Sequence, residues 1–217
     1  MAYSGHVRPG GPAAVRELPQ LVLTKVSVGP MDNNAYLLRC RSTDAQVLID
    51  AANEADRLLD LVGTGGLEAI VTTHRHRDHW EALEEVAGAT GAARIAHPLD
   101  APELPVVATN LVTDGDVVDV GAVSLRVIHL RGHTPGSIAL LHEDPDGPPH
   151  LFTGDSLFPG GVGKTWSPED FAQLIDDVEH RIFGELPDET WVYPGHGDDT
   201  TLGAERPHLQ EWRTRGW

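Results

Sequence analysis

Hydrophobic and polar positions divide the chain into short strand-like runs and a few helical segments. Runs rich in Val, Ile and Leu that are bounded by turn residues are typical of β-strands. They predict strands at residues 21–28, 35–40, 45–50, 68–73, 93–98, 117–120, 123–130, 137–143, 150–158 and 189–197. Apolar residues at helical spacing predict helices at residues 54–63, 78–91 and 167–184. The pattern therefore indicates a mixed α/β protein.

Two of the predicted helices carry recognisable start signals. Ser167 precedes Pro168 and a run of acidic residues, and Gly184 follows the last apolar position, which is typical of a capped helix. Asp78 and Glu81 have the spacing of a capping box, so we expect the second helix to begin at Asp78.

The strand runs fall into two blocks, which indicates how the chain is organised. Blocks at residues 21–73 and 117–155 suit two sheets packed face to face with helices outside. Residues 1–18 are rich in Gly, Pro and Arg and show no periodicity, so we expect a flexible N-terminal arm. Residues 19–217 are expected to form a single domain.

Composition and charge exclude several kinds of partner. The chain has 16 Lys and Arg against 33 Asp and Glu, and its formal charge of −17 argues against nucleic acid or an anionic membrane as partner. Cys40 is the single cysteine, so no intrachain disulfide can form. With no apolar leader and no membrane-length apolar run, the cytoplasm is the expected location.

Three histidines and an aspartate gather at residues 74–79, directly after a predicted strand. Residues two apart on an extended loop project the same way, so His74, His76 and Asp78 are expected to converge, and His79 can turn in beside them. Imidazole and carboxylate groups together suit zinc, iron or manganese. The alternative is a polar loop in which Asp78 only caps a helix, although capping and ligation can coexist.

Further candidate ligands follow three later strands. His133 lies in RGHTPGS, Asp155 in FTGDSLF and His196 in YPGHG, each at a tight turn where functional loops tend to lie. Each alone could be an ordinary turn residue or a satisfied histidine. Together with the first cluster they favour a metal site.

The order H-x-H-x-D-H, GHTPG, GD and PGHG resembles that of the metallo-β-lactamase-fold hydrolases. The resemblance runs from about residue 20 to near the C-terminus and implies an αββα sandwich with two metals between the edges of the sheets. It also implies a ligand set in three parts: His74, His76 and His133 for one metal, Asp78, His79 and His196 for the other, and Asp155 as the bridge.

Two divalent ions at such a site suggest a hydrolytic reaction. Zinc is the expected metal, with iron or manganese as alternatives. Metals ~4 Å apart can lower the pKa of a shared water from about 16 to near neutrality, so that a bridging hydroxide is present at pH 7. Asp78, beside that hydroxide, is expected to orient it and carry its proton as the catalytic residue.

Local matches resemble the glyoxalase II-like thioesterases, which act on S-(2-hydroxyacyl) thiol esters. Asp155 argues against the β-lactamases, which lack an aspartate at the bridging position. Asn33, in DNNAYLL, matches an asparagine close to the metals, and Lys164, in GGVGKTW, falls where a basic residue binds the carboxylate of the thiol carrier. The expected partner is a small acyl thioester.

The chain also departs from glyoxalase II proper. Position 198 is Asp where that branch has Tyr, and the basic C-terminal extension that binds glutathione is not present, so the thiol carrier stays open. The alternatives are a lactonase on the same site, a sulfur dioxygenase with one iron on His74 or His76, His133 and Asp155, and a metal-binding protein without activity. Four tryptophans are expected to pack the C-terminal region or a partner surface, since aromatics there are more often core than substrate platform: Trp166, Trp191, Trp212 and Trp217.

Overall fold

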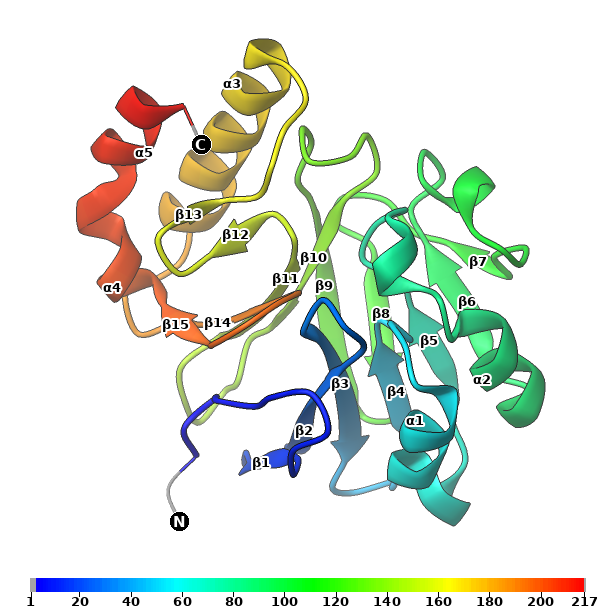
Figure 1. Ribbon diagram of the computed structural model, residues 1–217. Helices are drawn as coiled ribbons and strands as arrows, with labels where there is room; N and C mark the ends of the chain where they lie inside the picture. Colours follow the sequence, from blue (N-terminus) through cyan, green and yellow to red (C-terminus); the bar gives the residue numbers. More distant parts are fainter. Residues whose placement is uncertain (1–2, 217) are drawn as a thin grey trace.

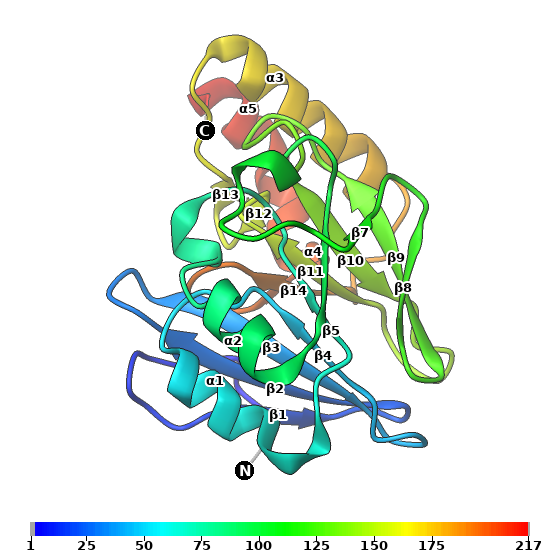
Figure 2. The same ribbon diagram turned by 90° about the vertical axis from the view of Figure 1, so that its right-hand side faces the viewer.

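The computed structural model describes residues 3–216, in which two β-sheets pack face to face and helices cover both outer faces (Figures 1 and 2). Within these residues, seven strands form the first sheet, in the order β1 (Ala14–Glu17), β2 (Leu21–Val28), β3 (Asn33–Cys40), β4 (Gln46–Ile49), β5 (Ala69–Val71), β6 (Ala93–Ala96) and β7 (Asn110–Leu111). Strands β1 to β4 are antiparallel neighbours, and β4 to β7 are parallel.

The second sheet is mostly antiparallel. In the described part of the chain its six strands follow the order β15 (Thr200–Thr201), β14 (Trp191–Pro194), β11 (His150–Gly154), β10 (Ile138–His142), β9 (Val123–His129) and β8 (Val117–Val120). Strands β11 and β14 pair in parallel, which brings the ends of both strands to the same edge. A small hairpin of β12 (Leu157–Phe158) and β13 (Gly161–Val162) follows β11.

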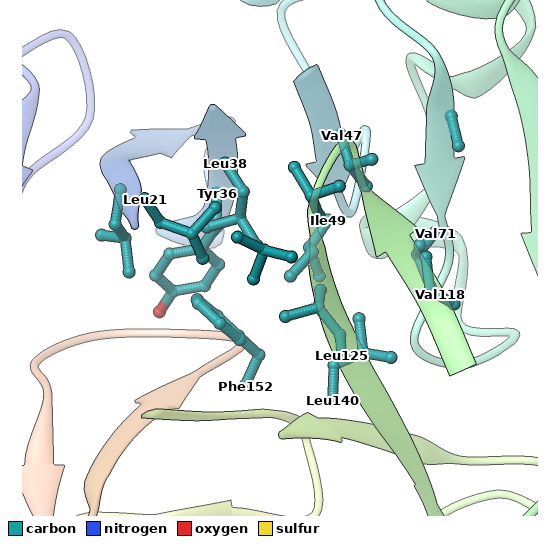
Figure 3. Packing of buried hydrophobic residues seen from close by; sticks show 14 of the residues in the cluster. Leu21, Tyr36, Leu38, Val47, Ile49, Val71, Val118, Leu125, Leu140 and Phe152 are labelled. Carbon is teal, nitrogen blue, oxygen red and sulfur yellow. The ribbon is translucent and has the colours of Figure 1, made fainter. Parts of the chain in front are cut away.

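The main hydrophobic core lies between the two sheets (Figure 3). Leu38 and Ile49 of the first sheet belong to the same buried cluster as Leu140 of the second. Tyr36 meets Phe152 edge to face, with ring centroids 5.3 Å apart. Offset or edge-to-face aromatic pairs of this kind stabilise a core beyond the area they bury.

Two further apolar clusters attach the helices. Helices α1 (Ala55–Val62) and α2 (Leu83–Thr90) pack on the outer face of the first sheet, while α3 (Pro168–Asp177), α4 (Leu202–Glu205) and α5 (Leu209–Arg215) pack on that of the second. Short 3-10 turns lie at Gly63–Gly65, Arg77–His79, Ala101–Glu103 and Arg206–His208, and a π-helical segment, Val178–Phe183, continues α3. The predicted four-layer αββα fold is confirmed.

One predicted helix start is confirmed and one is wrong. The side chain of Ser167 accepts a hydrogen bond from the backbone N–H of Asp170, and so caps α3 as expected. The helix predicted from Asp78 begins instead at Leu83, after a 3-10 turn. The carboxylate of Asp78 accepts a hydrogen bond from Asn33 at 2.8 Å and therefore does not cap a helix.

The sequence predicts a flexible arm at residues 1–18, and the structure contradicts this from Tyr3 onward. Residues 1–2 lie outside the described residues. Residues 14–17 form β1 against β2, and Val7 is buried. The Tyr3 hydroxyl donates to Asp199 at 2.7 Å, and the Lys25 ammonium donates to the carbonyl of Gly5 at 2.7 Å. These partners are distant in sequence, so they leave no local pattern in the N-terminal segment. No helix in residues 3–216 has both the length and the apolar character to cross a bilayer.

Candidate metal centre

The seven predicted ligands converge at one edge of the sandwich, although they come from both sheets. His74 and His76 follow β5, and Asp78 and His79 lie in the next turn. The other ligands follow strands of the second sheet: His133 after β9, Asp155 after β11 and His196 after β14. The edge therefore gathers the ends of strands from both layers, which is why ligands far apart in sequence meet.

The first group consists of His74, His76 and His133. Their ligand atoms lie within 4.8 Å of one another, and the Nε2 atoms of His74 and His133 are 3.3 Å apart. His74 and His133 are buried and His76 is half-buried. Three imidazoles at this spacing match a nitrogen ligand set for one transition metal.

The second group consists of Asp78, His79 and His196, with the same close spacing. The Nε2 atoms of His79 and His196 are 3.2 Å apart, and Asp78 Oδ2 lies 3.3 Å from His196 Nε2. Asp155 contacts both groups, since its Oδ1 lies 3.3 Å from His79 Nε2 and its Oδ2 lies 3.6 Å from His133 Nε2. The arrangement is that of two ligand sets sharing one carboxylate.

Hydrogen bonds on the outer side of the rings fix which nitrogen faces the centre. The Nδ1–H of His133 donates to the carbonyl of Lys164 at 2.7 Å, and that of His196 donates to the carbonyl of Met31 at 2.9 Å. Because a carbonyl only accepts, each Nε2 of the neutral ring carries a lone pair directed at the centre.

Asp50 orients two more of these rings and was missed by the sequence analysis. This buried carboxylate accepts from His79 Nδ1 at 2.9 Å and from the Thr73 hydroxyl at 2.8 Å. The same hydroxyl lies 3.0 Å from His74 Nδ1, so it relays the contact to that ring. The available signal was an acidic residue at the end of the buried run AQVLID, where a carboxylate needs a partner.

The first group has the protonation state that metal ligation needs. Burial lowers the pKa values of His74, His76 and His133, so all three rings are neutral near pH 7. Neutral imidazole is the form that donates a lone pair to a metal.

The second group attracts positive charge. Burial opposes a charged His79, but the Asp155 carboxylate raises its pKa well above the ordinary value. Burial likewise opposes a charged His196, yet hydrogen bonds with Asp155 and Asp78 raise its pKa to about 9. Burial disfavours ionised carboxylates, but the neighbouring histidines hold the pKa values of Asp78 and Asp155 below their usual range. The carboxylates thus stabilise cations here, whether protons or metal ions.

Two further observations fit a metal ion. Oδ1 of Asp155 is a buried oxygen that accepts no hydrogen bond within residues 3–216, although buried carboxylate oxygens normally have a donor. Gly195 approaches the centre so closely that a Cβ there would collide with Asp155 Oδ1 and lie 2.6 Å from His79 Cε1. A glycine at this position keeps space free around the ligand atoms.

The remaining candidates lie near the centre. Asn33 donates to Asp78 and lies 3.4 Å from His196 Nε2, beside the ligands as expected of a neighbour that orients them. Lys164 reaches the site through its backbone carbonyl, while its side chain is exposed and lies over the ring of Trp166. Of the tryptophans expected to pack the C-terminal region or a partner surface, Trp212 is buried, whereas Trp166 is 66% exposed and is not part of the core. Trp217 lies outside the described residues.

The fold and the ligand set define a metallohydrolase architecture, and comparison with known proteins identifies the family. The model of the metallo-β-lactamase superfamily matches residues 28–196, so the chain belongs to that superfamily of metal-dependent hydrolases. The resemblance found in the sequence motifs is therefore confirmed.

Individual relatives share sequence over most of the chain. It is 36% identical over 166 residues to a hydroxyacylglutathione hydrolase of Rhodospirillum rubrum, an alignment that covers 76% of this chain and 62% of the relative. The chain thus spans less than two thirds of that hydrolase.

Two solved structures share the fold at comparable identity. ETHE1 from Myxococcus xanthus has a TM-score of 0.78 and 30% identity, covering 88% of this chain and 84% of its own. TTHA1623, solved in a di-iron-bound form, has a TM-score of 0.70 and 34% identity. The match covers 84% of this chain and 96% of TTHA1623.

Proposed function

We propose that the chain is a dinuclear metal-dependent thioesterase of the glyoxalase II type, which cleaves S-(2-hydroxyacyl) thiol esters. The observation that carries the proposal is Asp155, whose two oxygens contact both ligand groups. The similarity to a hydroxyacylglutathione hydrolase supports the thioester substrate.

In this proposal, two divalent metals share the seven ligands. The first group, His74, His76 and His133, would hold one ion, the second group, Asp78, His79 and His196, would hold the other, and Asp155 would be shared by both. Bound metals would supply an activated water and polarise the acyl oxygen. Zinc suits this donor set, and the di-iron form of TTHA1623 supports iron as the alternative.

The chain's own residues orient the reactants. Asp78 is ionised, its side chain is 23% exposed, and Asn33 fixes its Oδ2, so the carboxylate can accept a hydrogen bond from the attacking water. The oxygen of that water bonds to the acyl carbon, the carbon–sulfur bond breaks, and the leaving sulfur takes up a proton. Asp78 is positioned to carry that proton.

The mono-iron alternative accounts for fewer of the contacts. It uses three ligands and gives no purpose to Asp78, His79 and His196, which lie as close together as the first group. A lactonase on the same two ions stays an alternative, because lactones and thioesters both have an acyl carbon that a water molecule can attack. A small-molecule substrate and a cytoplasmic location are also part of the proposal.

Metal analysis and thiol release test the proposal together. We expect about two metals per chain and release of thiol from lactoyl thioesters. Asp155→Ala is expected to lose at least one metal and most of the activity, whereas Asp146→Ala, in an exposed loop, retains both. One iron per chain, or full metal content in Asp155→Ala, would contradict the dinuclear assignment. Release of acid from lactones without release of thiol from thioesters would favour the lactonase.

A further inference from the structure

A pocket of about 430 Å³ adjoins the metal centre, because His133 is part of its wall. Arg75, Arg131, Trp166, Asp170 and Gln173 also line it. We propose that this pocket binds the negatively charged end of the thiol carrier, with Arg75 as the anion anchor and Trp166 as the flat surface beneath it. This inference rests on the proposed thioesterase function and names the substrate class as thioesters of an acidic thiol.

Arg75 is held at its backbone and open at its guanidinium. Its N–H donates to Asp100 Oδ2 at 3.0 Å, and its carbonyl accepts from the Trp80 indole at 2.7 Å. No hydrogen bond or ion pair of the Arg75 guanidinium occurs within residues 3–216. Arg75 lines the pocket, and a planar fork of donors that lacks a carboxylate partner is suited to bind a carboxylate or a phosphate.

The guanidinium of the neighbouring Arg77, unlike that of Arg75, already has a carboxylate partner. Arg77 lies two residues further along the same loop, but its guanidinium pairs with Glu81 at 2.9 Å and its side chain is 78% exposed. It does not line the pocket. The charge of Arg77 is therefore already partnered, and the open cation between the metal ligands is Arg75.

The other charged groups of the wall place the anion near Arg75. Arg131 forms two hydrogen bonds with Asp177 through its guanidinium, at 2.9 and 2.7 Å, so its charge is neutralised. Gln173 also donates to Asp177. Asp170, at the start of α3, repels an anion from the helical side of the pocket. An acidic ligand is thereby directed to the end of the pocket where Arg75 lies.

Trp166 supplies the apolar contact. Trp166 is 66% exposed, and its ring centroid lies 6.4 Å from that of the candidate ligand His76. The Lys164 ammonium lies 4.3 Å from the centre of the indole. An exposed large aromatic beside a pocket is typical of a ligand contact. In a chain of charge −17, the pocket is thus lined by Arg75 and by a tryptophan that carries the Lys164 cation, and local positive charge of this kind attracts anions.

A panel of thioesters with one acyl group and different carriers tests the proposal. Lactoyl thioesters of N-acetylcysteamine (neutral), N-acetylcysteine (a carboxylate) and phosphopantetheine (a phosphate) are compared on the metal-loaded protein. We expect higher kcat/KM with at least one acidic carrier, and the two acidic carriers separate carboxylate from phosphate. The ratio of acidic to neutral kcat/KM should fall about tenfold in Arg75→Gln, the size of one half-exposed charged hydrogen bond. Arg77→Gln should keep the wild-type ratio.

A binding measurement separates the two proposals. Calorimetric titration with S-methyl-N-acetylcysteine and S-methyl-phosphopantetheine, which cannot be hydrolysed, should show about tenfold weaker binding of the preferred ligand to Arg75→Gln and weaker binding to Trp166→Ala. If thioesters are cleaved but Arg75→Gln binds both ligands and selects carriers as the wild type does, the pocket assignment is overturned and the thioesterase stands. If no thioester is cleaved while Arg75 still governs binding, the proposed function fails and the anion site remains.

Discussion

Lys25 offers the sharpest test of how the structure holds the His196 loop. Its ammonium is fully buried and donates to three oxygens: Gly5 O at 2.7 Å, Gly197 O at 2.7 Å and Asp199 Oδ1 at 2.6 Å. Gly197 is the residue after the candidate metal ligand His196. Burial lowers the pKa of Lys25 and raises that of Asp199, and the charge of each partner opposes the shift of the other. The pair therefore depends on both members.

Replacement of Lys25 by Met removes the cation and leaves Asp199 buried with Tyr3 as its remaining side-chain donor. Loss of one partner of a buried ion pair costs about 3–5 kcal/mol. For a chain of 217 residues this corresponds to a drop in Tm of roughly 6–20 °C. Because Gly197 O also loses one of its two donors and keeps only Asn34, the variant is expected to hold a metal at the second group more weakly than at the first.

Urea unfolding of the chelator-treated protein measures the stability change, and metal analysis after dialysis measures retention. Lys164→Met is the matched control, since Lys164 is exposed and its removal should change the free energy of unfolding by less than about 0.5 kcal/mol. Lys25→Met/Asp199→Asn should recover part of the loss, because no buried carboxylate is left unpaired. A Lys25→Met protein within about 1 kcal/mol of the wild type would refute the account of this ion pair.

Three further predictions concern the centre and the core. Asp50→Asn should weaken metal affinity about ten- to a hundredfold in chelator competition, because Asp50 orients His79 and, through Thr73, His74; an unchanged affinity would contradict this. Burial lowers the pKa of His150 to about 3, against an ordinary value of 6.5, so the folded protein excludes a proton that the unfolded chain binds, and stability falls as the pH drops from 6.5 toward 3. Urea titrations of the metal-free protein at several pH values measure the free energy of unfolding. Between pH 6.5 and 3, this free energy should change by about 1.4 kcal/mol less per pH unit in His150→Phe than in the wild type. Removal of metal should lower stability by about 4 kcal/mol relative to protein in metal at a thousandfold excess over its Kd, and equal unfolding curves would contradict a site that forms only in the folded state.

Local pattern predicted the strands well and the segments with long-range partners poorly. Residues 21–28 and 117–120 form strands with the predicted bounds, because turn residues flank both apolar runs. The helix start at Asp78 was wrong because this side chain is held by Asn33 across the site. The N-terminal segment was misjudged for the same reason, since its order depends on Lys25 and on residues near the C-terminus.

The candidate ligands could be picked out from the sequence because they form distinctive clusters at strand ends, and the structure brings them together. Asp50 could not be distinguished, since it is one of 33 acidic residues and its role depends on the ring it meets. Arg75 escaped notice, and Trp166 was expected to pack against other residues, because spacing does not tell which side chains face a pocket. Such roles follow from how loops of the two sheets meet, which the sequence pattern does not encode.

The division of the ligands between the two sheets has a consequence for the order of events during folding. His74 and His76 follow a strand of the first sheet, whereas His133 and Asp155 follow strands of the second, so neither sheet alone carries a complete ligand group. Contacts between segments distant in sequence form late, after the local hairpins. The centre is therefore expected to close only when the sheets have docked. High-affinity metal binding is then expected only in the completed native state. It slows unfolding because each ligand group joins residues of both sheets.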